Sequence, residues 1–250
     1  MSSFYEPKGK AREYSPYALN LYMECYHGCR YCYAPSAIRK SAETYTRVAT
    51  PRRDIVRKLE NDLKYSVPKE QILLSFIGDP YGPASDDNAV TRDVLEVLLK
   101  YKAPVAILTK GGKRCLRDLD LFREFGEHIQ VGATLTFKDP ELSKEWEPNA
   151  ADPAERMEVL RTLHDNGVRT FASFEPVIST EQALQLMRDG LDFIDVYKVG
   201  KLNHMPEIER RISWDLFLRD TVRILREAGK AFYIKHDLRQ AAPAVRLYGN

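Results

Sequence analysis

Three of the four cysteines lie in one short stretch, where Cys25, Cys29 and Cys32 follow the spacing Cys-x3-Cys-x2-Cys. This spacing lets a single loop wrap three thiolates around one inorganic centre. A complete set of protein ligands for a [4Fe–4S] cluster has four members. Three cysteines therefore predict a cluster in which one iron stays open to a substrate or a cofactor.

Zinc is the main alternative for these cysteines, because His27 would complete a nominal Cys3His set. Structural zinc sites usually pair two groups of ligands that a longer run separates. The sequence has no second pair of closely spaced Cys or His residues, and the other histidines are isolated. The spacing therefore favours an iron–sulfur cluster over zinc.

The length and composition are those of a soluble globular protein, with 250 residues, 44% hydrophobic and 30% charged. We expect one domain, with residues 1–17 as an N-terminal arm and residues 18–235 as the core. Four cysteines in a chain of this size do not indicate a disulfide framework, and no run of about 18 apolar residues is present. The start of the chain lacks the apolar core of a signal peptide, so we expect a cytoplasmic protein. The net charge of +2 argues neither for nor against a nucleic-acid partner.

Apolar runs and helical patterns alternate along the chain. Strands that are apolar on both faces and alternate with amphipathic helices predict a parallel sheet covered by helices. The fold class is therefore α/β, as a partial (β/α)6 barrel of the TIM type with short terminal extensions. The expected strands are 18–23, 71–77, 104–108, 129–136, 170–174 and 193–199, with 231–234 as a final strand or a cap, and the expected helices are 50–65, 88–101, 116–125, 152–166, 181–188 and 213–228.

Polar and small residues follow the predicted strands, where barrels of this kind carry their active sites. They should converge on one mouth together with the cysteine loop. For Asp79 and Glu175, the alternative is a carboxylate that caps the following helix. The strand-end residues are Gly78, Asp79, Pro80, Thr109, Lys110, Thr134, Thr136, Ser173, Glu175, Lys198 and Gly200.

The cysteine loop, with the aromatic Tyr31 just before the last cysteine, resembles the signature of the radical S-adenosylmethionine (radical SAM) superfamily. The β/α rhythm extends this resemblance over nearly the whole chain. The segments Tyr14-Ser15-Pro16-Tyr17 and His27-Gly28-Cys29-Arg30-Tyr31-Cys32-Tyr33 are similar to the spore photoproduct lyase-like branch. The resemblance implies a [4Fe–4S] cluster on Cys25, Cys29 and Cys32, with SAM chelated at the open iron. Reductive cleavage of SAM would then yield methionine and a 5′-deoxyadenosyl radical that abstracts a substrate hydrogen.

The resemblance also implies roles for the strand-end residues. Gly78-Asp79-Pro80 takes the place of the family's Gly-Gly-Glu-Pro motif, which contacts the SAM amino group, although Asp replaces Glu and one glycine is missing. Tyr31 would pack beside the adenine. The expected contacts to the SAM carboxylate and ribose come from Lys110, Ser173, Glu175 and Lys198, and Thr134 and Gly200 complete the expected cofactor site.

A hydrogen-atom relay is the third implication of the resemblance. In the photoproduct lyases, the tyrosines that flank the last cluster cysteine join such a relay with a separate cysteine. Tyr31 and Tyr33 match those tyrosines. Cys115 is the one spare cysteine and a candidate hydrogen donor, but its position does not match the family's donor. A buried and inert cysteine is the alternative.

Three hypotheses remain for the function. The first is a radical SAM enzyme with a nucleic-acid base or lesion as substrate, which would make it a lyase or a modifying enzyme. The resemblance supports it, as do the interleaved aromatic and basic residues of 4–22, although an arm laid over the barrel also explains those residues. The second is a radical SAM enzyme that acts on a small molecule or a peptide, and the third is a non-catalytic iron–sulfur or zinc-binding module. Either enzyme needs an outside one-electron donor, which we expect to be a flavodoxin or a ferredoxin.

Overall fold

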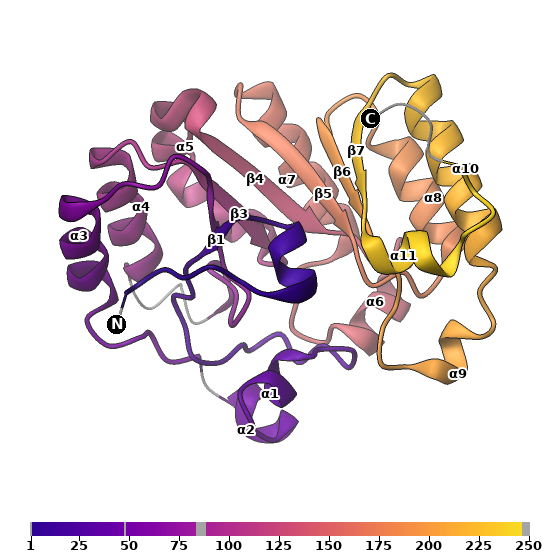
Figure 1. Cartoon of the computed structure of the whole chain (residues 1–250), viewed down its shortest axis with the longest axis horizontal. Coiled ribbons are helices and arrows are strands. Elements are labelled where there is room, and N and C mark those ends of the chain that lie inside the picture. The colour runs from indigo at the N-terminus through magenta and orange to yellow at the C-terminus, as the bar shows by residue number, and fades with distance from the viewer. Residues whose placement is uncertain (1, 48, 84–88, 247–250) are drawn as a thin grey trace.

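Seven parallel strands form one sheet, in the order of the sequence from β1 to β7. The structure is a computed structural model, which describes residues 2–47, 49–83 and 89–246. The sheet curves into a half-barrel (Figure 1). The strands are β1 Tyr17–Ala18, β2 Ile72–Leu74, β3 Val105–Thr109, β4 Ile129–Thr134, β5 Arg169–Phe174, β6 Val196–Val199 and β7 Ala231–Ile234.

One helix that covers the sheet follows each of the first six strands, so the chain repeats a β/α unit. These helices are α3 Ile55–Tyr65, α4 Val90–Lys100, α5 Leu119–Phe125, α7 Pro153–Asp165, α8 Thr180–Asp189 and α10 Trp214–Glu227. Shorter helices lie in the connections: α1 Ala34–Ala37, α2 Ala42–Arg47, α6 Pro140–Trp146, α9 Pro206–Glu209 and α11 His236–Ala241, with 3-10 helices at Gly9–Glu13, Gly112–Asp118 and Gly126–His128. No helix in the described ranges is long and apolar enough to cross a membrane.

The predicted fold class is confirmed, and the run at 231–234 is a seventh strand that pairs with β6. The first strand is much shorter than predicted. Its ladder to β2 ends early because the Asn20 side chain accepts hydrogen bonds from Phe76 N and Ile77 N, both at 2.9 Å. Residues 21–23 then pair with residues 50–52 through Arg52 N to Leu21 O and Met23 N to Thr50 O.

The predicted helix start at Thr50 is wrong, whereas the predicted start at Asp152-Pro153 is confirmed. The pairing of residues 50–52 delays the helix predicted at Thr50, which begins at Ile55. The capping box at Asp152 is not formed, because the Asp152 side chain makes no capping hydrogen bond. The predicted stop at Asn166-Gly167 is confirmed, with Gly167 at φ +76°. Part of the loop before α4, including the predicted helix start at Asn88, lies outside the described residues.

The core lies in two places. Most of it fills the space between the outer face of the sheet and the helices. A smaller cluster lies inside the half-barrel, where Tyr14 of the N-terminal arm packs with Leu73, Ala106 and Phe171. The inside of the barrel is therefore closed by an arm residue rather than by the strands alone.

The N-terminal arm, residues 2–16, crosses from the first strand to the last (Figure 1). Near its start, Ser3 N donates to Asp62 of α3 at 2.6 Å. Near its end, Glu13 accepts hydrogen bonds from Tyr233 OH of β7 at 2.9 Å and from His236 N of α11 at 2.7 Å. The arm therefore spans the open side of the half-barrel, as the simpler interpretation of residues 4–22 predicted.

Replacing Glu13 tests how the arm is held. Glu13→Ala removes two charge-assisted hydrogen bonds, which are worth about 1.5–3 kcal/mol each. We expect trypsin to cleave the arm at Lys8, Lys10 or Arg12 about tenfold faster or more in this variant. Limited proteolysis followed by mass spectrometry measures the effect. Glu6→Ala is the matched control, since Glu6 contacts only the exposed Arg12 and its loss should leave cleavage nearly unchanged.

Candidate active site

A cavity of about 410 Å³ opens at the carboxyl ends of the strands, and the cysteine loop forms one of its walls. All predicted site residues line it except Pro80, Cys115, Thr136, Lys198 and Gly200. Most of the strand ends therefore converge on one mouth, as the sequence predicted. The lining residues from the predicted set are Cys25, Cys29, Tyr31, Cys32, Tyr33, Gly78, Asp79, Thr109, Lys110, Thr134, Ser173 and Glu175.

The cysteine loop has no regular secondary structure between Glu24 and Tyr33, so other segments must hold it. Cys25 N donates to Tyr45 O at 3.2 Å, and Arg30 N donates to Trp146 O at 2.9 Å. Asn149 N donates to His27 O at 3.1 Å, and its side chain donates to Tyr26 O at 3.0 Å. The segment 146–149 after β4 is therefore the main backbone support of the loop.

Burial raises the pKa of all three cluster thiols. Burial raises the pKa of Cys29 to about 11, although Lys110 partly offsets the effect. Burial, followed by the charge of Asp79, also raises the pKa of Cys25. Iron binds thiolates, so loading of the loop must displace these protons.

The donor geometry does not support the zinc alternative. Among the described residues, no three Cys, His, Asp or Glu side chains are arranged around one possible metal ion. Both ring nitrogens of His27 already face protein oxygens, so it offers no lone pair as a fourth ligand. Thiolates of a [4Fe–4S] cluster bind separate irons and need not converge on one point. Three cysteines around one cavity suit that larger group.

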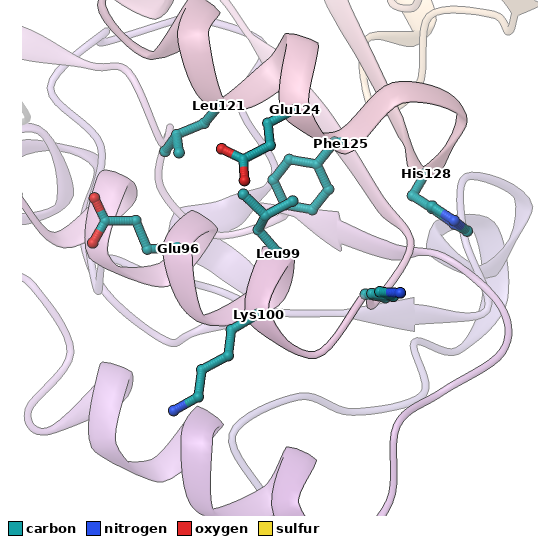
Figure 2. A pocket seen from close by; sticks show the side chains of 8 residues that line it. Glu96, Leu99, Lys100, Leu121, Glu124, Phe125 and His128 are labelled. Carbon is teal, nitrogen blue, oxygen red and sulfur yellow. The ribbon is translucent and has the colours of Figure 1, made fainter.

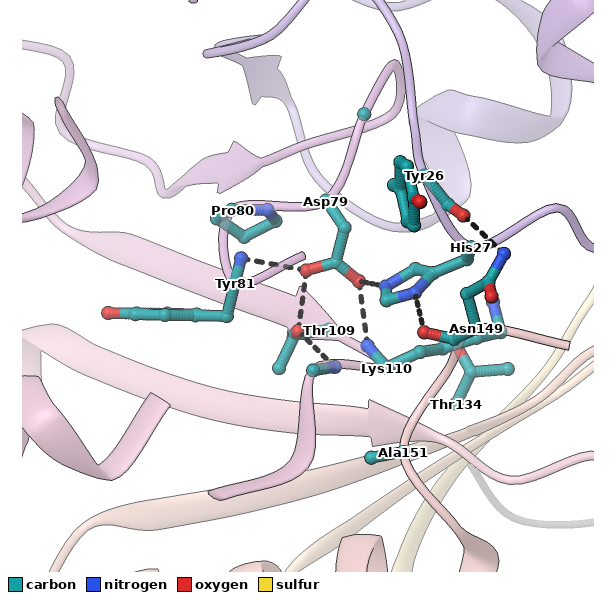
Figure 3. Close-up of polar contacts among 12 residues, drawn as sticks. Tyr26, His27, Asp79, Pro80, Tyr81, Thr109, Lys110, Thr134, Asn149 and Ala151 are labelled. Atoms are coloured by element: carbon teal, nitrogen blue, oxygen red, sulfur yellow. Dashed lines mark hydrogen bonds and ion pairs between the residues drawn. The ribbon is translucent and has the colours of Figure 1, made fainter. Parts of the chain in front are cut away.

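Asp79 is the most heavily bonded side chain of the site (Figure 3). Its Oδ1 accepts from Tyr81 N at 2.8 Å and Thr109 Oγ1 at 2.6 Å. Its Oδ2 accepts from Lys110 N at 2.7 Å and lies 2.9 Å from His27 Nε2. Burial alone would raise the pKa of Asp79, but His27 and the other donors outweigh it and lower the pKa to about 2. The carboxylate is therefore ionised, and its acceptor positions are used within the protein.

Lys110 places a cation in the cavity beside the cysteine loop. Its ammonium lies 5.6 Å from the centre of the Tyr31 ring and has no hydrogen bond or ion pair within the described part of the chain. Burial would lower the pKa of Lys110, but the neighbouring Cys29 and Glu147 outweigh it and raise the pKa. A cation without a partner in a cavity is a ready site for an anionic group of a ligand.

A buried network that the sequence did not predict holds Tyr31. Its hydroxyl donates to Glu147, and Glu147 pairs with Arg156 of α7 at 2.5 Å. Burial would raise the pKa of Glu147, but Arg156 and Lys110 lower it, so the carboxylate is ionised. No motif in the sequence indicated that Glu147 reaches Tyr31.

On the opposite wall, Glu175 is held by the arm and by the end of β7. Its Oε2 accepts from Tyr14 OH at 2.7 Å and from Lys235 Nζ at 2.6 Å. This arrangement is not the predicted alternative of a helix-capping carboxylate. Lys235 follows the final strand, so the strand-end rule that found Glu175 would also have found Lys235 if it had been applied there.

Gly200 and Lys198 support this wall from behind the cavity. A Cβ at Gly200 would lie 2.8 Å from Glu175 Cδ, so glycine permits the close approach of that side chain. Lys198 donates to Tyr14 O at 2.6 Å, and burial followed by the charge of Lys235 lowers the pKa of Lys198 to about 8. Both residues act through their neighbours, as Pro80 does by accepting from Thr91 through its carbonyl.

Cys115 does not reach the cavity. It is fully buried in the core between the strands and the outer helices, where burial raises the pKa of its thiol to about 12. Its expected role as a hydrogen donor at the mouth therefore needs correction, and the structure supports the alternative of an inert packing residue.

A second concavity lies on the outside of the molecule, between α4 and α5 (Figure 2). Its volume is about 630 Å³, which exceeds that of the mouth cavity. Leu99, Phe125 and His128 are among the residues that line it, but no residue of the predicted site does so. Its size alone does not make it the active site.

The chain matches the family model of the radical SAM superfamily over residues 19–188, and it therefore belongs to this superfamily. Its cofactors are accordingly a [4Fe–4S] cluster and SAM. The matched range contains all three cysteines of the loop. The resemblance to this superfamily is thereby confirmed.

Solved structures share the fold at low sequence identity. SuiB of Streptococcus suis bound to S-adenosylmethionine has a TM-score of 0.66 and 17% identity, and the match covers 92% of this chain and 52% of SuiB. A spore photoproduct lyase variant with bound AdoMet and dinucleoside spore photoproduct has a TM-score of 0.66 and 14% identity, covering 92% and 78%. The expected lyase branch is thus among the structural neighbours, together with a second kind of radical SAM enzyme.

Curated relatives are longer than the aligned region. Protein MJ0683 of Methanocaldococcus jannaschii is 34% identical over 163 residues, which cover 65% of this chain and 60% of the relative. Protein Rv2578c of Mycobacterium tuberculosis is 27% identical over 170 residues, covering 65% and 49%. ORF301 of Acidianus two-tailed virus is 24% identical over 208 residues, covering 77% and 66%. The chain therefore spans about half to two thirds of the length of these relatives.

The four cysteines allow a matched test of the cluster site. After anaerobic reconstitution, Cys29→Ala should lose the cluster absorbance and the SAM cleavage, because an essential thiolate is gone. Cys115→Ser should keep both, because Cys115 lies outside the cavity. Iron content and deoxyadenosine formation under dithionite are the measurements. Retained cleavage in Cys29→Ala would contradict the ligand assignment.

Proposed function

We propose that this protein reductively cleaves SAM at its [4Fe–4S] cluster and uses the 5′-deoxyadenosyl radical to abstract a hydrogen from a nucleic-acid base or lesion. The observation that carries the proposal is the shared cavity. The three cysteines and the unpartnered cation of Lys110 line one wall, and a separate group of basic residues lines the rim. The cavity therefore offers room for SAM and for a substrate beside it.

Different residues of the cavity would contact different parts of SAM. The cluster, when bound, supplies the electron that cleaves SAM. Lys110 would hold the SAM carboxylate, since its ammonium faces the cavity beside Cys29. Gly78 and Asp79 would line the amino end of SAM, and Tyr31 would lie beside the adenine. The ribose side would be lined by the strand-end residues Thr134, Ser173 and Glu175.

Removing the Lys110 charge should weaken SAM binding. A charge-assisted hydrogen bond contributes about 1.5–3 kcal/mol, so Lys110→Met should raise the Kd for SAM by about 10–100-fold. Lys113→Met is the control, because Lys113 is exposed and pairs with Glu158. Equilibrium dialysis with the reconstituted protein measures both. An unchanged Kd in Lys110→Met would remove Lys110 from the SAM site.

Tyr33 is the better placed of the two tyrosines for a hydrogen-atom relay. Its side chain lines the cavity and is 48% exposed. Tyr31, by contrast, donates its hydroxyl proton to the ionised Glu147 and serves as a fixed wall. Cys115 is buried and does not line the cavity, so it would not be the cysteine of such a relay.

The basic rim supports a phosphate-bearing substrate. Lys8 and Lys10 come from the arm, and Lys201 and His204 come from the loop after β6. Lys10 pairs with Asp237 at 2.9 Å and Lys201 pairs with Glu209, whereas Lys8 has no partner among the residues that the structure describes. Lysine side chains bind backbone phosphates without reading sequence. The dinucleoside bound to the photoproduct lyase structure supports the same substrate class.

Salt dependence distinguishes this substrate from the alternatives. Binding of a single-stranded oligonucleotide should weaken steeply as the salt concentration rises. Lys8→Ala should reduce the slope of log K against log salt concentration by the contribution of about one phosphate contact. Lys64→Ala on α3 is the control, because Lys64 lies outside the cavity lining. Fluorescence anisotropy measures both. Binding that is absent or insensitive to salt would favour a small molecule or a peptide, such as the precursor peptide bound to SuiB in a related structure.

The reaction also needs an outside electron donor. The sequence has no cysteine set beyond the loop for a second cluster, so a flavodoxin or a ferredoxin would deliver the electron. Reduced thiols and an exposed iron site suit the cytoplasm, where we place the protein.

A further inference from the structure

His27 is the one buried side chain between Cys25 and Cys29. It is 2% exposed, whereas Tyr26 is 42% exposed and Gly28 has no side chain. Its Nδ1 lies 3.1 Å from Asn149 O, and its Nε2 lies 2.9 Å from Asp79 Oδ2. The imidazole therefore bridges the backbone carbonyl of Asn149, after β4, and the carboxylate of Asp79, after β2. The cysteine loop is thus fixed to the barrel by buried polar contacts of the His27 side chain.

Asp79 extends this fixation to the next strand. The same Oδ2 that faces His27 accepts from Lys110 N, and Oδ1 accepts from Thr109 of β3. One carboxylate after β2 therefore holds the cysteine loop on one side and the backbone of Lys110 on the other. Figure 3 shows these contacts meeting at Asp79.

We propose that the contact between His27 and Asp79 positions two parts of the site at once, the loop that holds the cluster and the lysine that faces SAM. Both are positioning residues. The part about Lys110 rests on the proposed function, whereas the part about the cluster rests on family membership.

Two amide substitutions at His27 separate the two hydrogen bonds. The amide nitrogen of glutamine can replace Nε2, so His27→Gln keeps a donor toward Asp79. The amide nitrogen of asparagine replaces Nδ1, so His27→Asn keeps the donor toward Asn149 but loses Asp79. Loss of a residue that orients metal ligands costs about 10–100-fold in metal affinity. We therefore expect His27→Asn to release iron to a chelator about 10–100-fold faster than His27→Gln.

Asp79→Ala tests the coupling to Lys110. Alanine removes the carboxylate oxygen that contacts both His27 and Lys110 N, so both positioning contacts are lost. We expect faster iron release together with weaker SAM binding, whereas His27→Asn should affect iron release more than SAM binding. Electron paramagnetic resonance of the reduced cluster, with and without SAM, reports the cluster environment independently of turnover.

The controls keep these outcomes distinct. His128→Gln, in the outer concavity of Figure 2, should behave as the unmodified protein does. Thermal unfolding of each metal-free variant shows whether it folds, and a folded His27→Asn variant with unchanged iron release and spectrum would overturn the proposal. Equally fast iron release from His27→Gln and His27→Asn would also overturn it, because the hydrogen bond to Asp79 would then make no difference to how the cluster is held. Normal cluster binding in Cys29→Ala would instead reject the ligand assignment itself.

Discussion

Parallel pairing is the constraint on which this structure depends. Because all seven strands run the same way, their carboxyl ends meet at one edge, and every connection there becomes a potential wall of the site. The sheet stops at a half-barrel, so the mouth stays open on one side. The cysteine loop occupies the β1 end of this mouth, and Glu175 and Lys235 occupy the other end.

The strand-end residues were predictable because two simple regularities fix them. Apolar runs locate the strands, and parallel topology brings the polar residues that follow them together, as it does for Asp79, Lys110 and Glu175. The spacing of the cysteines predicts a cluster site without any knowledge of the fold. The length of the first strand was not predictable. It depends on the Asn20 side chain, which accepts the hydrogen bonds of Phe76 N and Ile77 N in place of backbone carbonyls of a longer first strand.

Contacts between side chains that lie far apart in the chain could not be predicted from the sequence. Glu147 and Arg156 reach each other and Tyr31 only after α6 and α7 have packed. His27 was visible between two cysteines, yet its spacing suggests a metal ligand rather than a side chain that contacts a carboxylate. What decides its role is Asp79, 52 residues away along the chain. Burial also distinguishes Cys115 from the other cysteines, and no spacing rule reveals burial.

The crossing of the N-terminal arm makes the two walls of the cavity depend on different parts of the chain. Every polar anchor of the cysteine loop described above lies at or before Arg156. The contacts of Glu13 with Tyr233 and His236 span 220 and 223 residues, so the opposite wall is complete only when the last strand is in place. Loss of the last strand and its following helix would therefore release the arm and open that wall, whereas the anchors of the cysteine loop would stay within the remaining chain.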